Sequence, residues 1–135
     1  MRLEPVHPQH VVALWPQVAP FLERAFVHSA GEYSLEQLKA LLTSGQQTLL
    51  ILIDEDKALH GALTIATENY PNACVAFVTA VGGRQIVSPE NFAQLFEWCR
   101  SRGYTTIRGA SFASVGRLWR RFGAREIYRV VEMKL

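Results

Sequence analysis

The sequence predicts an α/β fold of the mixed α+β type, in which helices cover both faces of a central mixed sheet. Residues 1–6 predict a first strand, and two helical segments follow between residues 10 and 45. Two apolar segments joined by the turn-like run DEDK, residues 47–71, predict an antiparallel hairpin, and residues 72–83 predict a further strand. Helical and strand-like segments then alternate over residues 84–135. The predicted order is therefore β-α-α-β-β-β-α-β-α-β.

Composition and length indicate one globular domain. The chain has 135 residues, of which 49% are hydrophobic and 19% charged, and we expect residues 1–135 to form a single domain. No apolar run approaches the ~20 residues of a membrane span, and the start lacks the apolar stretch of a signal peptide. Cys74 and Cys99 lie inside apolar patterns, which predicts reduced core thiols and a cytoplasmic location. His7 and His10 have no second pair of soft ligands nearby, so we expect no metal site.

The two helical segments before the hairpin are marked differently. Over residues 10–33 apolar residues recur at helical spacing, but Pro16 and Pro20 interrupt them, which leaves open one kinked helix or two short ones. In the second segment Ser34 and Gln37 have the spacing of a capping box. Its apolar stripe and closing glycine are Leu35, Leu38, Leu41, Leu42 and Gly45.

The later elements also carry start and stop signals. Ser88 fits the N-cap of a helix, Pro89 its first position and Gly103 the position just past its end. The inward face of this helix is Phe92, Leu95, Phe96 and Cys99. Residues 105–111 predict a short strand, and the alternating residues 125–135 predict a last strand. A helix over residues 114–124 separates them, with the apolar stripe Val115, Leu118, Trp119 and Phe122 and a closing Gly123.

Charge is distributed unevenly along the chain. The net charge is +2, but residues 1–83 carry −4 and residues 84–135 carry +6. This asymmetry favours an anionic ligand or partner. Four arginines of the late helix and its end lie away from the apolar stripe and form a basic face: Arg117, Arg120, Arg121 and Arg125. We expect this face to contact other proteins, with non-specific nucleic-acid contact as the alternative and no membrane partner.

The stretch AVGGRQIVSPEN, residues 80–91, joins a strand to a helix, where many α/β proteins bind phosphate. Its glycine pair, residues 82–83, precedes Arg84 and therefore lies at the strand end and not at the helix entry. At the helix entry Pro89 has no N–H, and Glu90 places a negative charge in the first turn. We interpret the glycine pair as the point where the chain leaves the sheet.

The order of elements and the stretch SVGRLWRRFGA resemble the GCN5-related N-acetyltransferase (GNAT) superfamily, whose late helix has the pattern N-x-x-A-x-x-L-Y-x-x-x-G-F. Leu118 matches the leucine and Gly123 the glycine. The resemblance covers nearly the whole chain by element order and residues 75–124 by motif. It implies a GNAT-like fold and, in active members, acetyl-CoA as cofactor. The residues in the place of the cofactor loop, which would hold acetyl-CoA in an active protein, are Val81, Gly82, Gly83 and Arg84.

The sequence departs from the GNAT pattern at the positions that the resemblance would make catalytic. The resemblance implies that a tyrosine of the late helix protonates the departing thiolate, but this position is Trp119, whose indole is not a practical acid. The asparagine position falls on Phe112 and the final phenylalanine on Ala124. Strand 72–83 contains no carboxylate to act as a base. We therefore predict no catalytic residue and no cofactor, with Trp119 in the core. The same structural interpretation applies to Glu32, Tyr33, His60 and Glu68.

Two hypotheses of function remain open. The first is a catalytically degenerate GNAT-fold protein that serves as a structural or binding component. Its length, its segment GEYSLEQLKALLTSG and its degenerate loop are similar to those of small GNAT-like internal virion proteins of phages. This similarity implies a phage-encoded virion protein, located in the host cytoplasm or the virion. The alternative is an active acetyl-CoA-dependent N-acetyltransferase that works largely by alignment of its two substrates.

Overall fold

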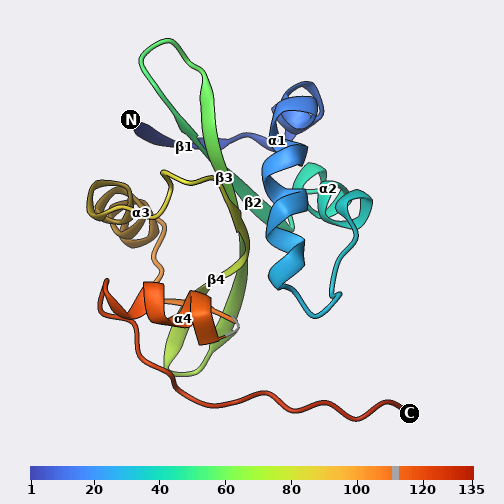
Figure 1. The fold of residues 1–135 in the computed structure, drawn as a ribbon, viewed down its shortest axis with the longest axis vertical. Coiled ribbons are helices and arrows are strands. Elements are labelled where there is room, and N and C mark those ends of the chain that lie inside the picture. Colours follow the sequence, from blue (N-terminus) through green and yellow to red (C-terminus); the bar gives the residue numbers. More distant parts are fainter. Residues whose placement is uncertain (111–112) are drawn as a thin grey trace.

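The computed structural model describes residues 1–110 and 113–135, which form a five-stranded sheet covered by helices (Figure 1). The strands are β1 (Arg2–Val6), β2 (Gln47–Ile53), β3 (Leu59–Tyr70), β4 (Ala73–Gly82) and β5 (Thr106–Gly109). They lie in the order β1-β2-β3-β4-β5, and the first four pair antiparallel. β5 pairs parallel with β4 through a helical crossover. The mixed sheet with its helices confirms the predicted fold class.

The helices cover both faces of this sheet. They are α1 (Val11–Ala25), α2 (Leu35–Thr43), α3 (Pro89–Ser101) and α4 (Ala113–Arg120), with short 3-10 helices at Pro8–His10 and Phe26–His28. In Figure 1, α1 and α2 lie on one side of the sheet and α3 and α4 on the other. None of the helices in the described part of the chain is long and apolar enough to cross a membrane.

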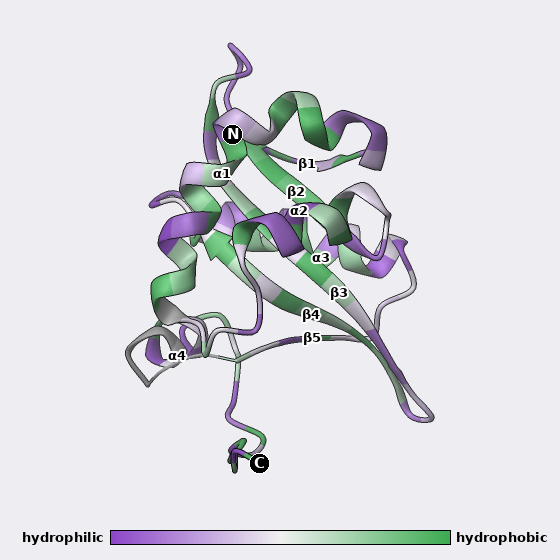
Figure 2. Ribbon diagram, turned by 90° about the vertical axis from the view of Figure 1, so that its right-hand side faces the viewer, coloured by the Kyte–Doolittle hydropathy of each residue, from purple (hydrophilic) through white to green (hydrophobic). Residues whose placement is uncertain are grey.

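Two hydrophobic cores lie on opposite faces of the sheet and share β2. Side chains alternate along a strand, so Leu49 and Ile51 of β2 face one core while Leu50 and Leu52 face the other. The α1–α2 core comprises Val6, Val11, Trp15, Val18, Leu22, Leu38, Leu42, Leu49, Ile51, Ile53, Ala62 and Ala80. The α3 core comprises Leu50, Leu52, Leu63, Ile65, Ala76, Val78, Ile86, Phe92, Leu95 and Cys99. Figure 2 shows β2 and most of β3 as the hydrophobic centre of the molecule.

Helix α1 is a single helix despite two internal prolines. Pro16 and Pro20 are both exposed, and the buried stripe of the helix runs along the opposite side. A proline cannot donate to the carbonyl four residues earlier, so the carbonyls of Val12 and Pro16 lose their helical partners. Because these two residues also lie on the exposed side, water can replace the missing donors. The choice between one helix and two is thus decided by the face on which the prolines lie.

The predicted helix caps are confirmed. At the start of α2 the Ser34 hydroxyl accepts a hydrogen bond from the Gln37 N–H at 3.1 Å, and the Gln37 side chain accepts one from the Ser34 N–H at 2.9 Å. At the start of α3 the Ser88 hydroxyl accepts from the Asn91 N–H at 3.2 Å. Each cap satisfies backbone donors that a helix start otherwise leaves unpaired.

Asp54 organises the turn between β2 and β3. One of its carboxylate oxygens accepts the backbone N–H groups of Asp56 and Ala58, at 2.8 and 3.0 Å. Its other oxygen lies 2.8 Å from Nε2 of His60. The hydrogen bond from His60 is the largest cause of a lowered pKa of Asp54, and the bond from the Ala58 N–H adds to it. Asp54 therefore holds both the turn and the first residues of β3.

We expect the protein to lose stability as the pH is lowered through the acid range, and we expect protonation of Asp54 to cause part of this loss. Its pKa is lower in the folded than in the unfolded chain, so its contribution is complete above the unfolded value and disappears as pH falls through the folded value. The window opens just above the unfolded-chain value of 3.8 and continues below it. Urea denaturation of the wild type and Asp54→Asn across this window should show a steeper loss for the wild type. Equal slopes would contradict the assignment.

Two sequence predictions on the last part of the chain are wrong. Residues 125–135 form neither strand nor helix in the described structure, and they extend away from the body (Figure 1). A strand needs a backbone partner, and in the described structure this segment pairs with no strand of the sheet. Leu118, predicted in the core, is 36% exposed, because α4 packs through Trp119 and the turn after it packs through Phe122. The side chain of Val115 lies outside what the structure describes.

Candidate functional site

The parallel pairing of β4 with β5 stops before β4 ends, and the end of this pairing is the candidate site. Their pairing joins Val75–Val78 to Thr106–Gly109, whereas β4 continues to Gly82. The register between β3 and β4 also shifts here, from Thr64 opposite Ala80 to Ile65 opposite Val78. Thr79 is the extra residue of this bulge. Ligands of open α/β sheets commonly bind beyond the carboxyl ends of parallel strands, where neighbouring strands diverge.

A chain of three neutral side chains holds the bulge on the side of the α1–α2 core. The Thr79 hydroxyl lies 2.6 Å from the Thr64 hydroxyl and donates to Oε1 of Gln47 at 2.7 Å. A hydroxyl has one proton, so the consistent assignment is that Thr64 donates to Thr79 and Thr79 donates to Gln47. Thr64 is fully buried and Gln47 nearly so. This polar cluster fixes the backbone but offers no titratable group.

The polar cluster was missed at the sequence level. Its signal was present, since Thr64 and Thr79 are polar residues inside otherwise apolar strand segments. A bulge moves one residue out of strict alternation, so the alternating pattern alone does not bring these two hydroxyls to the same face.

The glycine pair at the end of β4 is packed tightly against other backbone. A Cβ added to Gly82 would overlap the carbonyl oxygen of Phe21 in α1. One added to Gly83, whose φ is +113°, would overlap the carbonyl oxygen of His60 in β3. Val81, just before them, packs against the α3 core. The small size of both glycines is thus used by contacts within the protein.

Two hydrogen bonds of Asn91 hold the loop from β4 to α3. Ile86 is buried, with 2% of its surface exposed, and packs in the α3 core. The Asn91 side chain donates to the Gln85 carbonyl at 2.6 Å, and the Asn91 backbone N–H donates to the Ser88 hydroxyl. Pro89 has no N–H to offer, and Glu90 is negative. These residues do not fit the pyrophosphate of a coenzyme A cofactor, which needs several free N–H groups at a helix entry. Arg84 is exposed beside them.

Trp119 is packed as a core side chain. Its ring meets Phe92 of α3 edge to face with centroids 5.9 Å apart, and a Cβ added to Gly109 of β5 would lie 3.2 Å from it. Phe122 meets the same Phe92 ring at 4.3 Å between centroids. This agrees with the expected structural role of Trp119. Phe112, at the asparagine position of the GNAT pattern, lies outside the described residues.

The basic face is exposed, although one of its members is paired. Arg117, Arg120, Arg121 and Arg125 all have exposed side chains. The guanidinium of Arg120 lies 3.4 Å from the carboxylate of Glu126, which also pairs with Arg129 at 3.1 Å. Arg120 is therefore partly neutralised within the chain.

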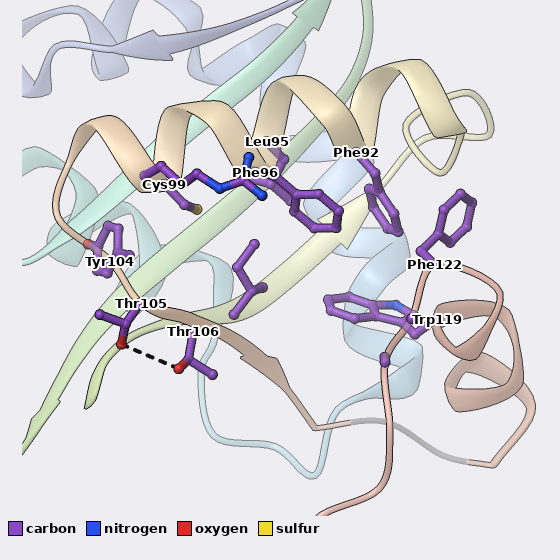
Figure 3. Close-up of a pocket in the computed structure, with 13 residues that line it drawn as sticks. Phe92, Leu95, Phe96, Cys99, Tyr104, Thr105, Thr106, Trp119 and Phe122 are labelled. Carbon is purple, nitrogen blue, oxygen red and sulfur yellow. Dashed lines mark hydrogen bonds between the residues drawn. The ribbon is translucent and has the colours of Figure 1, made fainter. Parts of the chain in front are cut away.

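An apolar cavity of about 300 Å³ lies between α3, β5 and α4 (Figure 3). Its apolar lining is Phe92, Leu95, Phe96, Cys99, Ile107, Trp119 and Phe122, and Arg100, Tyr104, Thr105 and Thr106 add polar groups. Figure 3 shows the rings of Phe92, Trp119 and Phe122 grouped at one end and Tyr104 at the other. Burial raises the pKa of the Cys99 thiol to about 11, so the thiol stays protonated at neutral pH and is a poor nucleophile. The cavity thus has the character of a hydrophobic binding surface.

The other candidate side chains do not converge on the site. Glu32 and Tyr33 line a shallow hollow over α2, and the Glu32 carboxylate accepts the Ala30 N–H at 3.1 Å. Glu68 accepts a hydrogen bond from the Tyr70 hydroxyl at 2.6 Å near the end of β3, which raises the pKa of Tyr70. His60 is bound to Asp54 at the opposite end of that strand. In the described residues no three His, Cys, Asp or Glu side chains group as metal ligands.

Comparisons with known proteins find matches among solved structures alone. No family model matches the sequence, and no curated protein matches it. A probable acetyltransferase superposes with a TM-score of 0.72 at 16% identity, covering 100% of this chain and 97% of the other. A ribosomal-protein-alanine N-acetyltransferase from Brucella melitensis biovar Abortus 2308 has a TM-score of 0.72 at 12% identity and 100% coverage of both chains. An aminoglycoside acetyltransferase from an uncultured soil metagenomic sample gives 0.69 at 14% identity, with 99% and 95% coverage. At these identities the likeness shows a shared fold.

Proposed function

We propose that this protein of the GNAT acetyltransferase fold is a structural or binding component that does not transfer acetyl groups, such as a phage-encoded virion protein. The observation that carries the proposal is the packing at the end of β4. Gly82 is closed off by the Phe21 carbonyl, and Ile86 of the following loop is buried in the α3 core. These contacts, together with Pro89 at the helix entry, support a strand end that is packed against the protein itself and offers few donors to a cofactor.

The side chains near the end of the β4–β5 pairing support the same proposal. General acid–base chemistry needs a titratable group within hydrogen-bonding reach of the reacting atoms. The polar cluster of Gln47, Thr64 and Thr79 is neutral and internally hydrogen-bonded. Trp119 stands at the position of the GNAT acid and packs against Phe92. These residues can hold a backbone in place, but they do not supply a proton or accept one at neutral pH.

The proposed partner surface is the basic face. Arg117, Arg121 and Arg125 are exposed, and we expect them to meet an acidic surface of another protein. Non-specific contact with nucleic-acid phosphates is the second expectation for the same side chains, and it would weaken steeply with salt.

Titration with acetyl-CoA tests the proposal. We expect no heat of binding by calorimetry and no rise in the midpoint of thermal unfolding up to about 1 mM ligand. A Kd of about 10 μM would instead stabilise the fold by about 2.7 kcal/mol at 1 mM ligand, because the ligand would then be at 100 times its Kd. That result, with binding weakened in Arg84→Ala, would overturn the proposal. An active acetyltransferase measured in parallel serves as the positive control.

The second candidate function is an active acetyl-CoA-dependent N-acetyltransferase. The observation that favours it is that the parallel pairing of β4 and β5 stops next to the bulge at Thr79, since open α/β sheets bind ligands beyond the carboxyl ends of such strands. In that case residues 81–84 would lie against acetyl-CoA, and alignment of amine and thioester would supply much of the rate. The titration above separates the two functions, since this one requires acetyl-CoA binding.

A further inference from the structure

We propose that the cavity between α3, β5 and α4 binds a small amphipathic carboxylate, whose apolar body lies inside the cavity and whose carboxylate is bound by Arg100 at the mouth. The lining of this cavity includes none of residues 81–84, all of which the structure describes. The inference therefore concerns a separate binding site. It goes beyond the proposed function and does not depend on it.

The apolar part of the cavity sets the size of the ligand. Its volume of about 300 Å³ lies at the lower end of the range of small-molecule pockets. At the packing density of a protein interior it holds roughly ten non-hydrogen atoms. One end is formed by aromatic rings that are fixed by contact with one another, since Trp119 and Phe122 both meet the Phe92 ring edge to face (Figure 3). A preformed apolar wall of this kind fits a hydrocarbon body of about eight carbon atoms.

The inner wall of the cavity carries no charge. Leu95 and Cys99 lie one turn apart on α3 and are 2% and 3% exposed, and Ile107 of β5 lines the same cavity. The Cys99 thiol is protonated at neutral pH because burial raises its pKa to about 11. A carboxylate placed against these side chains would lose its water without gaining a partner. The anionic end of the ligand must therefore lie at the mouth.

Arg100 supplies a cation at the mouth. Its side chain lines the cavity and is exposed, and it follows Phe96 by one helical turn. Within the described residues no Asp or Glu lines the cavity, and no carboxylate lies within ion-pair distance of Arg100. A guanidinium binds a carboxylate through two parallel hydrogen bonds. The charge at the mouth thus favours an anionic head group.

Two neutral polar side chains of the lining already have partners. The Tyr104 hydroxyl lies 2.6 Å from the Thr67 hydroxyl, and the Thr105 hydroxyl accepts the Cys74 N–H at 3.0 Å. These groups are bonded within the protein and do not require a ligand. Arg100 is therefore the group that selects between a charged and an uncharged ligand.

Two arginines at the end of α3 give a matched pair of variants. Arg102 is exposed like Arg100, but its guanidinium lies over the Trp98 ring, 5.8 Å from the ring centre, and it does not line the cavity. Arg100→Gln and Arg102→Gln remove the same net charge. Each variant and the wild type are titrated with octanoate by calorimetry. The ligand control is 1-octanol, which has the same chain without a charge.

We expect octanoate to bind the wild type with a Kd below about 1 mM. Hexanoate should bind about tenfold more weakly, because it buries two fewer CH₂ groups. Arg100→Gln should raise the octanoate Kd about threefold to fivefold, the effect of one exposed ion pair, and leave the octanol Kd unchanged. Arg102→Gln should change neither value.

Three results would overturn the proposal. The first is failure of octanoate to bind, including the case in which the chain's own residues fill the cavity in solution. The second is an equal rise of the octanoate Kd in both arginine variants, since binding would then depend on net charge alone. The third is an equal Kd of octanoate and octanol in the wild type, which would remove the role of Arg100.

Nuclear magnetic resonance locates the ligand independently of these variants. We expect nuclear Overhauser contacts from the octanoate chain to the Phe92 ring and to the methyl groups of Ile107. Ile107→Trp should fill the cavity and weaken octanoate and octanol alike, with hydrogen exchange in β2 and β3 as the check that the variant is folded. Contacts to residues outside the cavity lining would place the ligand elsewhere and contradict the assignment.

Discussion

Gly82→Ala is expected to lower the free energy of unfolding by about 3 kcal/mol or more, at or above the upper end for overpacking in a core. The added methyl group would overlap the carbonyl oxygen of Phe21, which belongs to helix α1 and has no flexible side-chain end that can move aside. Urea denaturation measures the loss directly. The midpoint of thermal unfolding should fall by roughly 10 °C or more.

Gly103→Ala provides the control for this substitution. Gly103 ends α3 with φ at +84°, and an added Cβ would have no neighbour within 4 Å. Alanine there costs only the strain of a left-handed backbone, about 1 kcal/mol. If Gly82→Ala were as mild as Gly103→Ala, α1 would be able to move away from β4. The space after β4 would then be available to a ligand, against the proposed function.

Thr79→Val is expected to cost about 1–3 kcal/mol, the penalty for leaving buried polar groups without partners. Valine has nearly the same shape as threonine, so packing is kept while the central hydroxyl of the polar cluster is lost. The buried Thr64 hydroxyl and the Gln47 amide oxygen both lose their hydrogen-bond partner. The midpoint of thermal unfolding should fall by roughly 3–10 °C.

Thr106→Val is the matched control on β5. Its hydroxyl makes a long contact of 3.4 Å with the Thr105 hydroxyl in an exposed setting. A surface change of this kind is expected to stay within about 0.5 kcal/mol. Equal losses of stability in Thr79→Val and Thr106→Val would show that the polar cluster does not stabilise the bulge.

Local sequence signals predicted the helices and strands up to β5, because each of these signals depends only on residues that lie close together in the sequence. Ser34 with Gln37 and Ser88 with Pro89 mark helix starts through contacts within one turn, and the structure contains both starts. The alternation and apolar runs of β2 to β4 likewise need no knowledge of distant residues. The order of these elements then leaves few ways to arrange the sheet.

The site itself depends on contacts that sequence spacing does not contain. The glycines of β4 were interpreted as easing the chain off the sheet, but Gly82 is required by Phe21, which is 61 positions away. Thr64, Thr79 and Gln47 meet because a bulge shifts the register of β4. Leu118 has helical spacing with Trp119 and Phe122, yet α4 is too short to bury it. Alternation in residues 125–135 predicts a strand, but it does not show whether a partner strand is within reach.

The sharing of β2 by two separate cores has a consequence for how the sequence can change. Leu49 and Leu50 are adjacent, but their side chains belong to different cores, and the sheet lies between them. Substitutions far apart and without shared partners have additive effects on stability, whereas substitutions in contact do not. We expect double variants with one change in each core to be additive and double variants within one core to be coupled. The two faces of the sheet are therefore free to diverge independently: drift in the face under α1 and α2 leaves the surface formed by α3, β5 and α4 intact.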